Sequence, residues 1–109
     1  MDDSAPRARF DVAGGRDGHA VVHVSGEIDL SAKWLFQECL DDVIVASDDD
    51  VVVDLAEVSF IDSTGLSVLL QARERLGTAG RKLRIARQSP SVTRLLELAG
   101  LDAVFDNGD

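Results

Sequence analysis

The amino-acid sequence predicts an α/β domain in which helices pack on a mixed, mostly parallel central sheet of about four or five strands. Extended apolar runs alternate with helical apolar patterns after an initial hairpin. The 109 residues suffice for one compact domain, and 45% of them are hydrophobic, which is enough for a core. We expect a single domain spanning residues 1–109, with a core from about residue 9 to 105 and loose ends.

The first part of the chain predicts a hairpin and then a helix. "RFDVAGGRDGHAVVHVSGEID" reads as two extended runs around a Gly-rich turn at residues 14–18. In the second run Val22 and Val24 fall on one face, and His23 on the other. Residues 30–46 show helical spacing, and Asp29 or Ser31 is placed to cap the start. The expected apolar stripe of this helix is Leu35, Cys39, Leu40, Val43 and Ile44.

The second part predicts strand, helix, strand and helix. "VVVDLA" is a β-branched run typical of a strand buried on both faces, and the strand ends near Asp62. A helix follows and ends at Gly77 and Gly80. Its expected stripe is Leu66, Leu69, Leu70, Arg73 and Leu76. "RKLRIAR" alternates as a strand does, and "SPSVTRLLELAGL" has Ser89 at the cap position of a last helix. "DAVF" is a candidate for a final short strand.

The charge is strongly acidic and unevenly distributed. The formal net charge is −9 and the pI about 4.5, which disfavours nucleic acid and anionic membranes as partners. Residues 1–62 carry 15 acidic and 4 basic side chains, whereas residues 63–109 carry 5 acidic and 7 basic. A protein partner of the first half is therefore expected to supply Arg or Lys.

Other features indicate a cytoplasmic setting without metal or cofactor. No apolar run approaches a membrane span, and "MDDSAPRARF" does not resemble a secretory signal. A single cysteine, Cys39, excludes an internal disulfide and a Cys-based zinc site, and we expect it to be a small buried apolar group. His19 and His23 lack a carboxylate-rich partner set, so we expect no metal site.

The junction "IDSTGL" concentrates polar groups where a strand leads into a helix. Asp62 or Ser63 can cap the helix, but a cap needs one side chain and Thr64 adds another hydroxyl. Gly65 costs about 1 kcal/mol relative to Ala in a helix, and we expect it to leave backbone open to another molecule. A hydroxyl at a helix N-terminus is also a favourable place for a phosphate, because free N–H groups and the helix dipole stabilise the anion.

The same junction does not support an enzyme. A serine hydrolase elbow needs G-x-S-x-G, but Ile61 occupies the first glycine position. The candidate bases His19 and His23 both precede Ser63 in the chain. The phosphate-binding P-loop motif is absent as well.

Three blocks of the sequence resemble bacterial anti-sigma factor antagonists, the single-domain STAS proteins. "VSGEIDLSA" resembles the family's acidic loop after the second strand, and "VVVDLAEVSFIDSTGLSVLL" its central D-[ST]-[ST]-G-L block. "SPSVTRLLELAGLDAVF" resembles the C-terminal block. The likeness covers roughly Arg9 to Phe105 and implies a STAS-like sandwich fold.

The resemblance implies a binding module switched by phosphorylation. Such an antagonist, when unphosphorylated, binds an anti-sigma factor that is also a serine kinase, and so releases the sigma factor. The kinase phosphorylates the serine that falls on Ser63 here, which ends binding, and a PP2C-type phosphatase removes the phosphate. The implied partner contacts are Glu27, Asp29, Leu30, Ser31, Asp62, Thr64, Gly65, Leu66 and Ser89.

Two other functions remain open at this point. The chain could be a STAS interaction module of another assembly, such as a lipid-transport complex or a stressosome-like scaffold. It could also be a regulator that binds a small nucleotide at the same helix start, although without a P-loop such binding would be weak. Trp34 lies off the main apolar stripe of its helix, where we expect partial packing, with a partner anchor as the alternative.

Overall fold

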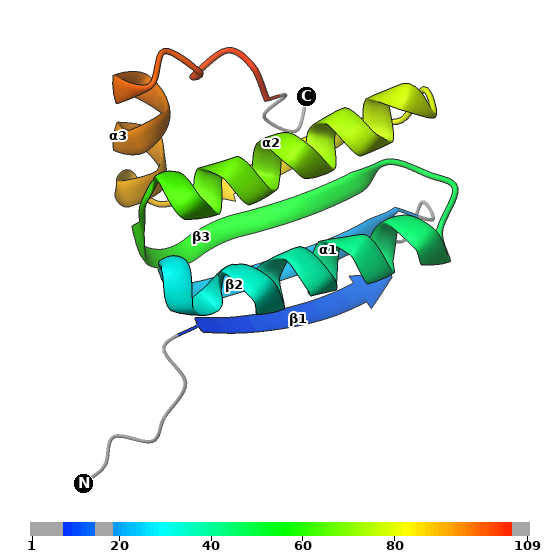
Figure 1. Cartoon of the computed structure of the whole chain (residues 1–109), viewed down its shortest axis with the longest axis horizontal. Helices are drawn as coiled ribbons and strands as arrows, with labels where there is room; N and C mark the ends of the chain where they lie inside the picture. The colour runs from blue at the N-terminus through cyan, green and yellow to red at the C-terminus, as the bar shows by residue number, and fades with distance from the viewer. Residues whose placement is uncertain (1–7, 15–18, 106–109) are drawn as a thin grey trace, which may run out of the picture.

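The computed structural model describes residues 8–14 and 19–105 and shows a four-stranded sheet with two long helices on one face (Figure 1). The strand order is β1-β2-β3-β4, with β1 antiparallel to β2 and the other neighbours parallel. The elements are β1 Ala8–Gly14, β2 Ala20–Ile28, the 3-10 turn η1 Leu30–Ala32, α1 Lys33–Ala46, β3 Val51–Ile61, α2 Ser63–Thr78, β4 Leu83–Gln88 and α3 Pro90–Leu98. The predicted α/β class and mostly parallel sheet are confirmed, while most of the Gly-rich turn and both chain ends lie outside the described residues. None of the described helices is long and apolar enough to cross a membrane.

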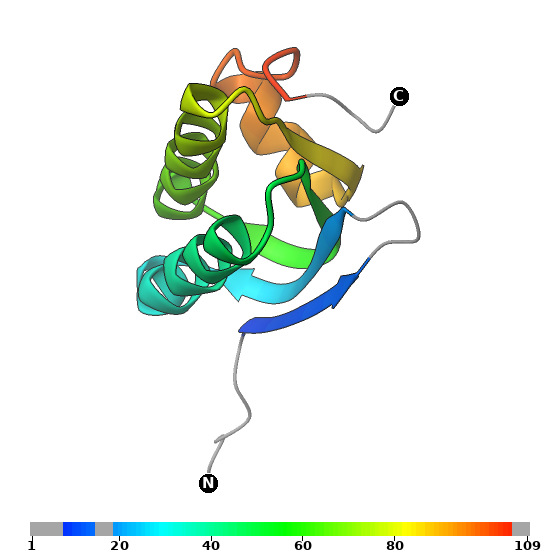
Figure 2. The ribbon, with the colours of Figure 1, turned by 90° about the vertical axis from the view of Figure 1, so that its right-hand side faces the viewer.

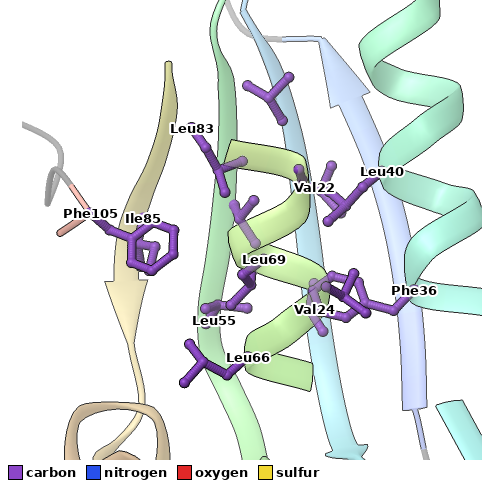
Figure 3. Close-up of a cluster of buried hydrophobic side chains, with 14 of the residues drawn as sticks. Val22, Val24, Phe36, Leu40, Leu55, Leu66, Leu69, Leu83, Ile85 and Phe105 are labelled. Carbon is purple, nitrogen blue, oxygen red and sulfur yellow. The ribbon is translucent and has the colours of Figure 1, made fainter. Parts of the chain in front are cut away.

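Helices α1 and α2 lie side by side on the same face of the sheet (Figures 1 and 2). Phe36 and Leu40 of α1 and Leu69 of α2 are fully buried against strand residues such as Val22 and Val24 (Figure 3). Burying each such side chain contributes about 1.5 to 3 kcal/mol relative to leaving it exposed. This shared core fixes the first turns of both helices relative to the ends of the strands.

The apolar stripe of α1 differs from the expected one. Phe36 is buried together with Leu40, Val43 and Ile44, whereas Leu35 is exposed. Residues 30–32 form a 3-10 turn, so the regular α-helical phase begins only at Lys33. In the second stripe Arg73 is likewise exposed, and Val68 and Ala72 are buried instead.

Cys39 lies at the edge of the core and is only partly buried. Burial raises the pKa of its thiol, and the negative charges of Asp42 and Asp11 raise the pKa further. A thiol that resists ionisation is a poor nucleophile, which agrees with a packing role.

None of residues 51–56 in β3 is exposed, which agrees with the expected burial on both faces, but around Asp54 the second face is covered by polar side chains. Asp54 of β3 points to this face, and its side chain is only 8% exposed. It accepts a hydrogen bond of 2.6 Å from Arg87 of β4, and His23 Nδ1 of β2 lies 3.1 Å from the same oxygen. Exposed side chains of His23 and Arg87 thus cover the carboxylate where a helix would otherwise pack.

Helix α3 continues from β4 and packs along the last part of β3. The backbone N–H of Ser89 donates to Leu55 O over 3.1 Å, and its hydroxyl caps the helix by accepting from Val92 N. Ser91 Oγ then donates to Ser59 O over 2.8 Å. The expected final strand "DAVF" was wrong, because residues 102–104 form a turn and the Phe105 side chain is buried in the same core cluster as Ile85 (Figure 3).

Candidate functional site

The carboxyl ends of β2 and β3 lie next to each other, and this brings the two acidic blocks of the sequence together. Ile28 pairs in register with Ile61, and the N–H of Asp62 donates to Ile28 O over 3.3 Å. Asp29 and Asp62 each follow directly after this pair. The parallel pairing of β2 and β3 thus places both segments at one end of the sheet, and Figure 1 shows η1 beside the start of α2 at that end.

The G-E-I-D segment is mostly strand, although we expected a loop. Gly26 to Ile28 are the last residues of β2, and only Asp29 lies beyond the strand. The pairing with β3 shifts register between Gly26 and Glu27, and Gly26 has φ 90°, a value that favours glycine. The irregular strand end leaves the Glu27 side chain exposed at the rim of the site.

Asp29 organises the short turn that joins β2 to α1. Its Oδ1 accepts hydrogen bonds from Ser31 N at 3.0 Å and from Ser31 Oγ at 2.6 Å. This caps η1 as the sequence predicted, because a carboxylate satisfies backbone donors that the turn leaves open. Between the two residues, Leu30 is held on the surface with 67% of its area exposed.

Asp62 is the N-cap of α2, which confirms the predicted cap. Its Oδ1 accepts from Thr64 N at 2.9 Å and from Gly65 N at 3.4 Å. We expected the free N–H groups at this helix start to stabilise a phosphate. This expectation was wrong in one respect, because the Asp62 carboxylate already accepts hydrogen bonds from the N–H groups of Thr64 and Gly65. Ser63 is exposed, so a phosphate on its hydroxyl would extend outward beside Asp62.

Gly65 has a different role from the one expected. It is buried, and a Cβ at this position would lie 2.7 Å from Ile28 Cγ2 and 2.9 Å from Ile61 Cγ1. Such contacts are far too short, so the missing side chain allows α2 to approach the ends of β2 and β3. The idea that the glycine opens the backbone to another molecule was therefore wrong.

Two more of the expected partner contacts are buried. Leu66 packs in the core below the first turn of α2, and Ser89 is enclosed at the start of α3. Both support the site from beneath and offer little surface to a partner. The expected residues that do reach the surface are Glu27, Leu30, Ser31 and Ser63, with Asp29, Asp62 and Thr64 half-buried.

The surface near this site also carries exposed apolar residues. Trp34, expected to pack partly, has 70% of its area exposed. Phe60, near the end of β3, is also exposed and lines a groove of about 360 Å³ with Pro90, Arg94 and Leu98 of α3. The sequence signal for the exposure of Trp34 is its position two residues before Phe36, which places it on the opposite side of the helix.

The two histidines pair separately with different carboxylates. His19 Nδ1 lies 3.2 Å from Asp49 Oδ2, whereas His23 Nδ1 lies 3.1 Å from Asp54 Oδ2. Among residues 8–14 and 19–105, no three His, Cys, Asp or Glu side chains gather in a way that could hold a metal ion.

Comparisons with known proteins agree with this architecture. Residues 12–108 match the family model of the STAS domain. An anti-sigma-F factor antagonist of Mycobacterium tuberculosis, RsfB, is 32% identical over 102 residues, which cover 94% of this chain and 83% of the relative. The crystal structure of an anti-sigma factor antagonist from Mycobacterium paratuberculosis is 33% identical, covers 94% of this chain and 86% of its own, and has a TM-score of 0.80.

A more distant solved structure shares the fold alone. The anti-sigma factor antagonist SpoIIAA in its unphosphorylated form gives a TM-score of 0.72 at 22% identity, covering 93% of this chain and 89% of its own. Phosphorylated SpoIIAA, a Bacillus protein, gives 0.71 at 18% identity, with 93% and 92% covered. With the family model spanning almost the whole chain and a relative above 30% identity over 94% of it, this protein belongs to the STAS domain family.

Proposed function

We propose that the chain is an anti-sigma factor antagonist whose unphosphorylated form binds an anti-sigma factor with serine kinase activity and so frees a sigma factor. Phosphorylation of Ser63 by that kinase ends the binding, and a PP2C-type phosphatase restores it. The observation that carries the proposal is the exposed hydroxyl of Ser63, which directly follows the Asp62 cap where β2 and β3 end together. The names of the relatives, which are antagonists of anti-sigma factors, support the same function.

The electrostatics of the site support release by repulsion rather than by refolding. A phosphate on Ser63 would stand beside the carboxylate of Asp62 and near Asp29, whose strand end is paired with that of β3. In the complex this phosphate would also face the phosphates of the nucleotide bound to the kinase. Like charges brought together at an interface cost several kcal/mol, which is enough to convert tight binding into release. The first turn of a helix tolerates an anion, so the fold itself should persist. The SpoIIAA structures in both phosphorylation states share this fold to a similar degree.

The proposal is tested by incubating the chain with an anti-sigma factor kinase of the same organism and ATP, and mapping the phosphate by mass spectrometry. We expect one phosphate on Ser63 and loss of the complex on a sizing column. Ser63→Ala should remain bound to the kinase, and Ser63→Asp should bind weakly. Treatment of the phosphorylated chain with a PP2C-type phosphatase should restore binding.

Ser31→Ala is the matched control, because Ser31 is another exposed hydroxyl at the same end of the sheet. This variant should still be phosphorylated on Ser63. A phosphate found at another residue, or a Ser63→Ala chain that is still released after incubation with ATP, would contradict the mechanism.

A further inference from the structure

Exposed apolar side chains are concentrated where η1 leads into α1. Leu30 and Trp34 keep 67% and 70% of their area exposed, and Leu35 is exposed as well. Single exposed apolar residues are ordinary on protein surfaces, but a solvated Trp with two Leu within six residues forms a patch. We call Leu30, Trp34 and Leu35 the η1–α1 patch.

Trp34 faces away from the core because of its position in the helical turn. Ala32 and Phe36, two residues before and after it, are both buried. Two residues correspond to about 200° around a helix, so Trp34 projects from the opposite side. The Lys33 ammonium lies 5.5 Å from its ring centroid, on the surface. The ring is thus displayed to solvent.

The patch lies beside the proposed phosphorylation site. Turn η1 contacts both the end of β2 and helix α2, and α1 and α2 pack against each other. Their first turns lie at the same end of the molecule (Figure 1). Packed helices have axes about 8 to 10 Å apart, so one interface of standard size, about 800 Å² per partner, can cover both Ser63 and Trp34.

Lys33 lies against the Trp34 ring, but the charged side chains farther out around the patch are acidic. Glu27 is exposed at the end of β2, and Glu38 and Asp42 are exposed one and two turns beyond Trp34 on the same helix. A partner surface that covers the patch must avoid placing like charges opposite these carboxylates. It must therefore carry basic side chains around an apolar pocket.

From the exposure of Trp34, its place at the same end of the molecule as Ser63 and the acidic side chains around the patch, we propose that Trp34, supported by Leu30, is the anchor that inserts into an apolar, basic-rimmed pocket of the anti-sigma factor. This inference rests on the proposed function and adds a residue that anchors the partner. Trp is the residue type most enriched among such anchors, because it buries a large rigid surface. The anchor would hold the partner while the charge on Ser63 decides whether the complex persists.

The sequence contains one Trp, so this side chain can be observed selectively. The chain is labelled with 5-fluorotryptophan and titrated with the purified kinase that phosphorylates Ser63, and its single fluorine resonance is followed by NMR. We expect the resonance to shift and broaden on binding and to return after phosphorylation. A resonance that stays unchanged in a saturated complex would overturn the inference.

Substitution gives a second, independent readout. Trp34→Ala should weaken binding by about tenfold or more, and Trp34→Phe by less. Val45→Ala is the matched control, since Val45 is 78% exposed in the last turn of the same helix and should leave affinity unchanged. Because Trp34 contributes little to the core, all three variants should unfold at the wild-type temperature.

The two proposals fail in different ways. If the wild-type chain binds the kinase and Trp34→Ala binds equally well, the anchor is wrong and the proposed function stands. If the wild-type chain binds no anti-sigma factor kinase of its organism, the proposed function fails and the anchor with it.

Discussion

Asp62 determines which groups at the start of α2 are available to bind a ligand or to be modified. Its carboxylate takes the N–H groups of Thr64 and Gly65, the donors that an incoming phosphate or nucleotide would otherwise use. The small-nucleotide regulator considered from the sequence would therefore have to bind at this helix start without these two donors. What remains available is the outward-facing hydroxyl of Ser63, which suits modification by a partner.

A substitution at Gly65 distinguishes the effect of packing on stability from the effect of helix propensity. Gly65→Ala would gain up to about 1 kcal/mol in helix propensity but place a methyl group against Ile28 and Ile61. Ile28 is fully buried and cannot move aside freely, so overpacking of about 1 to 3 kcal/mol should prevail. We expect a net loss of stability in urea unfolding.

Gly77→Ala is the control for this substitution. Gly77 lies in the same helix with open space around it, so the added Cβ meets no atom within 4 Å. This variant should be neutral or more stable, by up to about 1 kcal/mol. Equal stabilisation by both substitutions would refute the packing role of Gly65.

At the scale of the elements, most of the fold could be predicted from local sequence signals. The order of the four strands and three helices and the Asp62 and Ser89 caps follow from periodicity and capping residues. These signals are short-range, and they do not report which of two adjacent apolar residues reaches the core. Leu35 was expected in the core for that reason, whereas Phe36 takes this place, four residues before Leu40 on the buried side of α1.

The candidate site was predicted less completely, because burial depends on contacts distant in sequence. Gly65 and Leu66 belong to the matching motif, but the approach of α2 to the ends of β2 and β3 encloses them. Trp34 was expected to pack partly, but within the described part of the chain no neighbouring element covers it. The final run "DAVF" alternates like a strand. In the structure it forms no strand, and only its Phe105 side chain is buried in the core.

The Asp54 carboxylate on the second face of the sheet should make the stability of the fold depend on pH. Burial alone would raise the pKa of Asp54, but hydrogen bonds from Arg87 and Ala56 and the charges of Arg87 and His23 lower the pKa below its ordinary value. A lowered pKa means that the fold favours the ionised carboxylate. Its contribution is therefore present at pH values above the unfolded pKa of about 4 and is lost as the pH falls through the lower folded pKa.

Asp54→Asn tests this linkage across three strands. The substitution should cost about 1 to 3 kcal/mol at neutral pH, because it removes a charged partner from a buried hydrogen-bonded group. The loss should shrink as the pH falls below about 4, when the wild-type carboxylate is protonated too. The measurement is urea unfolding from neutral to acidic pH, with Asp48→Asn in the exposed α1–β3 loop as the control. A penalty that stays constant over this range would show that Asp54 acts by shape alone.

At the scale of the whole molecule, the uneven charge should control how fast the partner arrives. The first 62 residues carry 15 acidic and 4 basic side chains, and they include the end of β2, η1 and all of α1. A long-range negative field steers a basic partner toward this side of the chain, and salt screens that field beyond about 10 Å at 0.1 M.

We therefore expect salt to act mainly on the association rate with the anti-sigma factor. Electrostatic steering raises association rates by about 10- to 1000-fold, and added salt should remove most of this gain while the dissociation rate changes little. The double variant Glu38→Gln, Asp42→Asn removes two exposed charges from the outer side of α1 and should flatten the salt dependence. Glu97→Gln, an exposed acid on α3 in the basic half, should not. Stopped-flow mixing at several ionic strengths measures both rates. If the dissociation rate carried the whole salt effect, the charges would act in direct contacts, and the acidic half would not be a steering surface.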